Sequence, residues 1–316
     1  MAQPFPVGPA RTEELEPALR LVFRHLPEEA RVTRVANALT LVCQGELDPQ
    51  GIAVVRGRSG LLGAIVSIRL PGASGLVWPP QAVDGPSRVE LEDALVRHAR
   101  AWLRQGKVKV AQALVVPQEA HLAAPLERNG FRHITTLWYF RHGLEGSGLE
   151  ERQARARLAN LTFQTYHDRD RTLFQDTLKR TYQGTLDCPE LNGVRTMDEI
   201  MDGHRGQGRH DPERWQLVLR GGRPVGVLLL TQMPEWDALD ISYLGVVPEA
   251  RGTGLGRVLT LRALLEAQRA GVSQATLAVD RRNLPAWNMY LQMGFQPNEP
   301  REVFLAIEST RGSPGQ

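Results

Sequence analysis

Three glycines at alternate positions, Gly252, Gly254 and Gly256, lie between a segment that predicts a β-strand and a segment that predicts an amphipathic helix. Glycines at such a junction let backbone N–H groups approach an anion closely, and the helix N-terminus adds positive potential there. A phosphate ester is therefore the expected ligand. A glycine-rich turn that only reverses the chain direction is the structural alternative.

The spacing of this loop excludes two common nucleotide-binding loops. It lacks the Gly-Lys-Ser/Thr sequence of a Walker loop, and Arg257 stands where a GxGxxG pattern requires its last glycine. The sequence therefore does not favour a site for ATP or for a dinucleotide.

Two further polar residues follow the next predicted strand. Asn283 precedes Pro285 at the start of a predicted helix, where an asparagine is expected to cap the first turn. Tyr290 lies on the same helix, shortly before Gly294. A helix tyrosine taken alone most often belongs to the core, so a chemical role for Tyr290 depends on the surrounding pattern.

Together these residues resemble the acyl-CoA signature of the GNAT N-acetyltransferase superfamily. The resemblance covers residues 215–307 strongly and the first half of the chain weakly, so the whole chain is similar to tandem GNAT proteins of mycothiol-synthase-like architecture. The segments that carry it are Val246-Val247-Pro248-x-x-Arg251-Gly252-x-Gly254-x-Gly256 and Val279-Asp280-x-x-Asn283-x-x-Ala286-x-x-x-Tyr290-x-x-x-Gly294-Phe295.

The resemblance implies acetyl-CoA as the co-substrate. The Val246 amide would polarise the thioester carbonyl, the strand ending at Val247 would pair with the pantetheine arm, and Asn283 would contact the pantetheine region. Backbone amides of the glycine loop would hold the pyrophosphate, with charge added by Arg251 or Arg257. The residues expected to bind the co-substrate are Val246, Val247, Arg251, Gly252, Thr253, Gly254, Leu255, Gly256, Arg257, Asn283 and Tyr290.

Tyr290 resembles the acid of the family, placed beside the thiolate that departs when an amine attacks the thioester. A tyrosine with a pKa of ~10 does not favourably protonate a thiolate whose conjugate acid has a pKa of ~8.5. Tyr290 is therefore expected to stabilise the departing sulfur by donating a hydrogen bond.

A base is also required, because an alkyl amine resembles lysine, with a pKa of ~10.4, and is almost wholly protonated at neutral pH. Asp240, on the strand that leads into the motif, is the candidate base, acting directly or through water. Glu235 and Asp237 are alternatives, although both lie in a segment that predicts a solvated turn. Upstream, the polar segments 182–193 and 202–205 are interpreted as substrate-specificity loops.

The elements that position these residues are repeated along the chain. In the second half, residues 215–220, 225–232 and 239–247 predict strands, residues 255–270 a helix and residues 276–280 a strand. The first half shows a comparable order, and its ending Asn129-Gly130-Phe131 matches Met293-Gly294-Phe295. The predicted fold is α/β (α+β), with two GNAT-like domains, each a mixed, mostly antiparallel central sheet flanked by helices. The glycine-rich segment 142–148 is the expected linker, which gives domains of residues 1–146 and 147–316.

The first half departs from the signature where the phosphate loop is expected. Residues 78–88 keep one glycine, contain Pro79 and Pro80, which lack N–H donors, and add Asp84, whose charge repels phosphate. Leu126 stands where the second half has Tyr290. Residues 1–146 are therefore expected to form a degenerate domain and residues 147–316 the catalytic one.

Composition excludes several other classes of protein. The chain has 316 residues, a mass of 35.1 kDa and a net charge of +3, with basic residues scattered among acids, which does not favour nucleic acid as a partner. No apolar run approaches the ~20 residues of a membrane-spanning helix, and the first residues show no export signal, so the cytoplasm is the expected compartment. Cys43 and Cys188 form no metal-binding pattern, and no metal is expected.

The leading hypothesis is an acetyl-CoA-dependent N-acetyltransferase in which an amine attacks the thioester directly in a ternary complex. The alternatives are a non-catalytic acyl-CoA-binding or sensor protein and an interaction scaffold. The sequence leaves the acceptor, the oligomeric state and CoA binding by the first half open.

Overall fold

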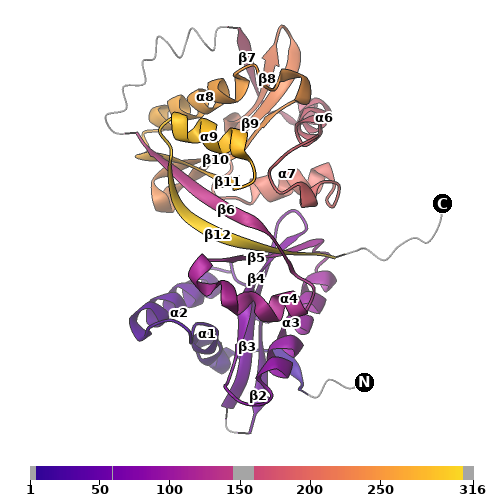
Figure 1. The fold of residues 1–316 in the computed structure, drawn as a ribbon, viewed down its shortest axis with the longest axis vertical. Helices are drawn as coiled ribbons and strands as arrows, with labels where there is room; N and C mark the ends of the chain where they lie inside the picture. The colour runs from indigo at the N-terminus through magenta and orange to yellow at the C-terminus, as the bar shows by residue number, and fades with distance from the viewer. Residues whose placement is uncertain (1–4, 59, 145–159, 309–316) are drawn as a thin grey trace, which may run out of the picture. The chain divides into compact units, whose positions relative to one another are not determined.

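The computed structural model describes residues 5–58, 60–144 and 160–308. These described residues divide into two compact units, one formed by residues up to 134 together with residues 301–308, and one formed by residues 135–144 and 160–300 (Figure 1). The expected domain boundary between residues 146 and 147 lies outside the described residues. The chain passes from one unit to the other within two of its strands, β6 (Arg132–Gly143) and β12 (Gln296–Ile307).

The first unit contains a mixed sheet in the order β1-β2-β3-β4-β5-β12, in which only the β4–β5 pair is parallel. Helices α1 and α2 cover one face, and α3 packs on the other face. The elements are β1 (Val7–Pro9), α1 (Leu15–Val22), α2 (Glu28–Cys43), β2 (Ile52–Gly57), β3 (Gly60–Leu70), β4 (Ser74–Ala82), α3 (Arg88–Gln105), β5 (Val110–Val115) and α4 (Ala124–Arg128).

The second unit contains a similar sheet in the order β6-β11-β10-β9-β8-β7, in which only the β10–β11 pair is parallel. Helices α6 and α7 lie on one side of its strands, and α8 and α9 lie on the other (Figure 1). The elements are β7 (Leu161–Thr165), α6 (Arg171–Thr181), α7 (Met197–Arg205), β8 (Trp215–Arg220), β9 (Arg223–Met233), β10 (Ala238–Val246), α8 (Leu255–Arg269), β11 (Gln274–Asp280) and α9 (Leu284–Gln292). The predicted mixed, mostly antiparallel sheets flanked by helices are confirmed.

Alternation along β9 explains why helices cover both faces of this sheet. Leu228 and Leu230 join the cluster under α8 and α9, whereas Val227 and Leu229 join the cluster under α6 and α7. Since successive side chains of a strand point to opposite faces, an uninterrupted apolar run must be buried on both sides. Strand β10 pairs with this buried strand, β9, along its whole length.

A bulge in β10 changes the direction of its side chains. Ile241 lies opposite Leu230 and Tyr243 opposite Leu229, so Ser242 is the extra residue. Ile241 consequently faces α8 and α9, whereas Tyr243 faces α6 and α7. Without the bulge, Ile241 and Tyr243, which are two positions apart, would point to the same face of the sheet.

Strands β10 and β11 pair only at their N-terminal ends. The parallel ladder joins Ala238, Leu239 and Asp240 to the start of β11 and does not continue to the C-terminal half of β10. Helix α8 connects these two strands, and the gap beyond the ladder lies at their carboxyl ends. Ligands of α/β sheets commonly bind at this position.

The first unit differs from the sequence prediction at the segment expected to be a degenerate phosphate loop. Pro79 and Pro80 lie within β4, where both oppose Ile65 of β3 in a bulge. A bulge tolerates proline because its extra residue donates no ladder hydrogen bond. The connecting loop is therefore limited to residues 83–87.

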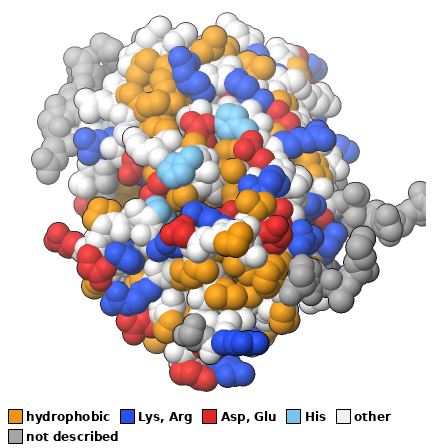
Figure 2. Space-filling view, turned by 60° about the horizontal axis from the view of Figure 1, so that its bottom comes forward, with side chains coloured by type: hydrophobic (Ala, Val, Ile, Leu, Met, Phe, Trp, Pro, Cys, Tyr) orange, Lys and Arg blue, Asp and Glu red, His pale blue; other side chains and the backbone are white. Residues whose placement is uncertain are grey.

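Charged residues are mixed over the face shown in Figure 2, where Lys and Arg side chains alternate with Asp and Glu instead of forming one stripe. Within the described residues, no helix combines the length and apolarity needed to span a bilayer. The same residues contain no group of three or more His, Cys, Asp or Glu side chains suited to a metal ion.

Candidate functional site

A cavity of about 1220 Å³ in the second unit brings together most of the predicted site residues. Its walls come from the C-terminal end of β10, the N-terminal end of α8, helix α9, and the segment from α6 to α7. Asp240, Val247 and Thr253 do not line it. The predicted residues that do are Val246, Arg251, Gly252, Gly254, Leu255, Gly256, Arg257, Asn283 and Tyr290.

Backbone conformation explains two of the loop glycines. Gly252 and Gly254 have φ angles of +71° and +79°, which residues with a Cβ rarely adopt. A Cβ at either position would have open space within 4 Å. The loop therefore presents an uncovered backbone surface, which a phosphate can approach.

The N-terminus of α8 supplies hydrogen-bond donors to that surface. The first backbone hydrogen bond of the helix runs from the Val258 N–H to the Gly254 carbonyl. The N–H groups of residues 254–257 precede this ladder, and no side chain caps them. Together with the helix dipole, these free donors create a positive potential that favours an anion.

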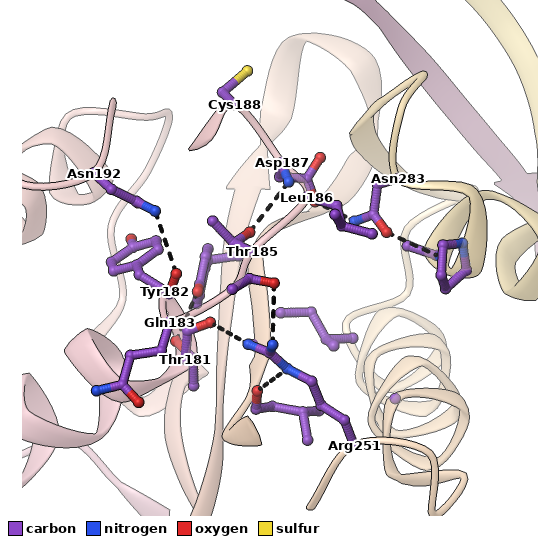
Figure 3. A pocket seen from close by; sticks show the side chains of 18 of the residues that line it. Thr181, Tyr182, Gln183, Thr185, Leu186, Asp187, Cys188, Asn192, Arg251 and Asn283 are labelled. Carbon is purple, nitrogen blue, oxygen red and sulfur yellow. Dashed lines mark hydrogen bonds between the residues drawn. The ribbon is translucent and has the colours of Figure 1, made fainter. Parts of the chain in front are cut away.

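The two arginines of the loop have different environments. The Arg251 guanidinium donates to the carbonyls of Val246, Gly184 and Thr181 at 3.1, 3.2 and 2.9 Å, as Figure 3 shows. Arg257 is exposed and donates to the neutral side chain of Gln292 at 3.2 Å. Arg251 therefore ties the end of α6 to the end of β10, whereas Arg257 keeps its charge available to an anion.

The backbone of Val246 faces the gap beside β11. The Val247 N–H donates to the Val225 carbonyl of the neighbouring segment at 3.1 Å. Because hydrogen-bonding directions alternate along an antiparallel pair, the N–H and C=O of Val246 point the other way. Its carbonyl accepts from Arg251, which leaves its N–H directed into the gap.

Val247 and Thr253, which were expected to bind the co-substrate, do not line the cavity, and Thr253 is exposed. Val247 is fully buried in a small cluster with Leu255 and Leu259. The Thr253 hydroxyl donates to the Ala250 carbonyl at 2.8 Å. Both residues hold the turn that leads into α8.

Tyr290 enters the cavity from α9. It is 7% exposed and packs against Phe140 and Phe295. Burial, followed by the charges of Asp187 and Asp240, raises the pKa of the Tyr290 phenol well above its ordinary value. The hydroxyl therefore remains protonated and can donate a hydrogen bond or act as a weak acid.

Asp240, the predicted base, lies on β10 beside β11. Its carboxylate accepts a hydrogen bond from the Thr276 hydroxyl at 2.7 Å. Burial raises the pKa of Asp240 to about 6, although hydrogen bonds from Thr276 and Ser242 oppose the rise. A carboxylate with this pKa is suited to accept protons near neutral pH, but since it lies outside the cavity lining it would act through water.

The predicted specificity segment 182–193 is pinned to the start of α9 by Asp187 and Asp280. The Asp187 carboxylate accepts from the Asp280 N–H at 2.8 Å and from the Asn283 side-chain amide at 2.7 Å. In return, the Cys188 N–H donates to the Asp280 carboxylate at 3.0 Å. Figure 3 shows the Asp187 and Asn283 side chains facing each other. Asn283 also accepts from the Ala286 N–H, which confirms the predicted helix cap.

An ion-pair network strengthens this attachment. Arg282 donates to Glu190 at 2.6 and 3.0 Å and to the fully buried Asp280 at 2.7 Å. Burial alone would raise the pKa of Asp280, but hydrogen bonds, led by those from Arg282 and Thr135, lower it to about 2. The anchor thus stays ionised at neutral pH. Burial raises the pKa of the Cys188 thiol to about 12, so this cysteine is not a ready nucleophile.

The cavity has a polar floor, in which sequence reasoning missed Thr181 and Tyr243, whereas Tyr182 and His204 belong to the segments interpreted as substrate-specificity loops. The Thr181 and Tyr243 hydroxyls are 2.7 Å apart, and the ring of Tyr182 lies 5.2 Å from that of Tyr243. Burial lowers the pKa of His204, whose ring lies 5.5 Å from Tyr243, to about 4, so this histidine is neutral. No local signal in the sequence identifies Tyr243 as a cavity residue, because the bulge at Ser242 decides where its side chain points.

Glu235 and Asp237, the alternative candidates for the base, lie outside the cavity lining, as do the nearby Trp236 and the helix residue Trp287. Glu235, Trp236 and Asp237 belong to the exposed turn after β9. Trp287 packs edge-on against Trp138 and Phe140 as part of the core. The turn acids are therefore poor candidates for the base.

Comparison with known sequences agrees with the geometry of this site. Residues 178–295 match the Acetyltransferase (GNAT) family. A relative named mycothiol acetyltransferase, from Thermomonospora curvata, is 28% identical over 276 residues, which are 85% of this chain and 90% of that protein. GNAT acetyltransferases use acetyl-CoA.

Solved structures show the same fold over nearly the whole chain. A GCN5-related N-acetyltransferase from Sphaerobacter thermophilus has a TM-score of 0.61 at 16% identity and covers 96% of this chain and 95% of its own. A tandem GNAT protein from the clavulanic acid biosynthesis pathway has a TM-score of 0.50 at 18% identity, covering 96% and 98%. Fold, glycine loop and sequence similarity agree that this chain carries a domain that matches the GNAT acetyltransferases, over residues 178–295.

Proposed function

We propose that the second unit binds acetyl-CoA along the end of β10 and the N-terminus of α8, and transfers its acetyl group directly to an amine. The observation that carries this proposal is the juxtaposition of two features at the end of β10. The Val246 N–H is directed toward the gap between β10 and β11, and the glycine-lined N-terminus of α8 next to it has no side-chain cap. These two features suit the two ends of one extended ligand, a thioester and a pyrophosphate.

In this proposal each residue has a limited task. The amides of residues 254–257 and the Arg257 side chain hold the pyrophosphate. The Val246 N–H donates to the thioester carbonyl oxygen as negative charge develops there. Tyr290 donates to the sulfur that carries the electron pair of the breaking C–S bond.

The amine must be neutral when it attacks. Asp240 takes its proton through water, and the amine nitrogen then forms the new bond to the acetyl carbon while the C–S bond breaks. The nitrogen becomes acidic once the new C–N bond forms, and its second proton passes to the departing sulfur, so the products are an amide and the thiol of CoA. Holding both substrates together makes this step effectively unimolecular, which favours direct transfer in a ternary complex.

We further propose that the first unit does not bind acetyl-CoA. Its Asp84 lies just before α3, where Arg24 donates to it at 2.7 Å and Arg88 at 2.8 Å. Hydrogen bonding and charge from Arg24 lower the pKa of Asp84, so the carboxylate stays ionised. The ionised Asp84 carboxylate thus already pairs with the arginines that a phosphate would need, and its charge repels a phosphate.

Calorimetric titration of acetyl-CoA tests these proposals. The native chain is expected to bind one equivalent, and Gly254→Asp is expected to abolish binding, because its carboxylate repels the pyrophosphate. Gly254→Asn is the matched control, since asparagine has the same shape, tolerates positive φ and carries no charge. Retention of acetyl-CoA binding by Gly254→Asp, or a stoichiometry of two, would contradict the proposal.

A further inference from the structure

The cavity contains one carboxylate among the described residues that line it. Asp187 occupies this position, and the other ionisable side chains of the lining are basic, neutral or phenolic, including Lys179, Arg257 and Tyr290. An amine acceptor arrives as an ammonium ion, which requires a negative partner when it leaves water. The lining offers that partner at Asp187.

The Asp187 carboxylate is fixed in direction and still has capacity for another donor. One oxygen accepts from the Asp280 N–H and the other from the Asn283 amide, at 2.8 and 2.7 Å. A carboxylate offers about four lone-pair positions, so two remain for a ligand. Because Glu190 and Arg282 hold the same loop, the carboxylate is positioned before any acceptor binds.

The charge of Asp187 acts on the reaction centre. After burial, it is the largest contribution that raises the pKa of Tyr290, and it also raises that of Tyr243. Loss of hydration raises the pKa of Asp187 itself, although its two donors and Arg282 oppose the rise. Asp187 and Tyr290 line the same cavity, so an ammonium beside this carboxylate would share that cavity with the hydroxyl assigned to the leaving sulfur.

The cavity wall formed by α7 and the segment before it presents several apolar side chains and the ring faces of two tyrosines, whose hydroxyls belong to the polar floor. Leu191, Met197 and Ile200 are half-buried, and the rings of Tyr182 and Tyr243 complete the wall. Apolar walls favour a ligand body that loses little hydration on entry and disfavour one covered with hydroxyl groups.

We propose that Asp187 binds the ammonium group of the acceptor and that this acceptor carries its amine on an apolar body. The inference rests on the proposed function only for the identification of the ligand as an acceptor; the binding itself is measurable without turnover. Asp187 is a specificity-determining residue in this scheme, distinct from Asp240.

Calorimetry with CoA-saturated enzyme tests the inference, with 2-phenylethylamine as the cationic probe and 2-phenylethanol as its neutral counterpart. The native protein is expected to bind the amine roughly 10- to 100-fold more tightly than the alcohol, as for a charge-assisted hydrogen bond. In Asp187→Asn this preference is expected to fall below about threefold, with unchanged acetyl-CoA affinity.

Glu190→Gln is the matched control, because it removes one negative charge from the same loop and loosens the loop anchor without altering the cavity lining. It is expected to keep the preference for the amine. An equal loss of preference in both variants would assign Asp187 a purely structural role, and a preserved preference in Asp187→Asn would overturn the inference directly.

Glucosamine, a polyhydroxylated amine, tests the apolar body. Weaker binding of glucosamine than of 2-phenylethylamine supports the inference, and tighter binding overturns that part of it. Product analysis separates this result from the proposed function. If the amine binds through Asp187 but no amine is acetylated, the proposed function fails and the binding inference stands; if amines are acetylated without dependence on Asp187, the reverse holds.

Discussion

Tyr290 is a residue whose function follows from its protonation. Burial raises its pKa, so the phenol keeps its proton and offers a hydrogen bond to a developing thiolate. Tyr290→Phe is expected to lower kcat by roughly 10²-fold or more, since general acid groups contribute about that much. Single-turnover acetylation measured by rapid quench checks the prediction.

The affinity for acetyl-CoA is the control for this substitution. The substitution removes only the hydroxyl and keeps the ring that packs against Phe140 and Phe295, so the shape of the cavity wall is retained. We expect an unchanged Kd for acetyl-CoA. An unchanged kcat in Tyr290→Phe would instead remove the tyrosine from the chemistry.

Asp240 should appear in the pH dependence of the reaction. Its pKa is raised to about 6, chiefly by burial, and only the ionised carboxylate accepts a proton. We therefore expect kcat/KM to rise with pH and to level off above about 6, and Asp240→Asn to lose this limb together with most of the activity. A pH–rate profile of both proteins with one amine provides the measurement.

The pH dependence of the free energy of unfolding reports on the ionisation of Asp240 independently of catalysis. Since the folded pKa of Asp240 is raised above its ordinary value, the folded state holds the proton more tightly than the unfolded chain. The contribution of Asp240 to the free energy of unfolding therefore falls as pH rises from about 4 to about 6, by on the order of 1–3 kcal/mol. Urea unfolding of Asp240→Asn should lack that decline.

At the scale of elements, the glycine loop has two arginines with separate tasks. Arg251 donates to three carbonyls, of α6, the following loop and β10, whereas Arg257 donates to Gln292 alone among the residues that the structure describes. We expect Arg251→Met to cost about 1 kcal/mol and to speed amide hydrogen exchange in residues 181–193, because exposed hydrogen bonds contribute modestly. Hydrogen-exchange mass spectrometry measures the change.

Arg257→Met is the counterpart of that variant, with the same loss of charge on the same loop. It should weaken acetyl-CoA binding, with a reduced salt dependence, and leave exchange in residues 181–193 unchanged. Identical exchange patterns in the two variants would show that the loop does not divide its tasks in this way.

At the scale of the whole molecule, the strands that complete each sheet come from the other half of the sequence. Leu137–Gly143 of β6 pair with the whole of β11 in the second unit, and Glu302–Ile307 of β12 pair with β5 in the first. Phe140, 1% exposed, packs between Trp287 and Tyr290. The second unit therefore needs residues that precede its own half.

This exchange predicts the behaviour of fragments. Residues 147–316 expressed alone should fail to fold, because loss of Phe140 by itself costs about 3–5 kcal/mol out of a typical total of about 5–15. Residues 132–300, which retain β6, should fold and bind acetyl-CoA. Circular dichroism and calorimetry compare the two fragments, and a folded 147–316 fragment would show that β6 is dispensable.

The amino-acid sequence by itself determined the features that depend on neighbouring residues. The glycine loop before α8, the Asn283 cap and the strand–turn–strand segments follow from backbone preferences and hydrophobic periodicity over a few positions. The GNAT fold and the family's activity could be predicted because they reside in such local patterns. Most of the expected co-substrate residues accordingly line the cavity.

Only the tertiary structure decided the features that join distant segments. The bulge at Ser242 turns Tyr243 toward α6, Pro79 and Pro80 fit a strand because Ile65 opposes them, and Asp187 meets Asn283 across 96 positions of the chain. Each of these depends on the register and packing of a partner strand or loop. A single sequence does not encode such pairings in any local window, because their free energy arises only when the separated segments come into contact.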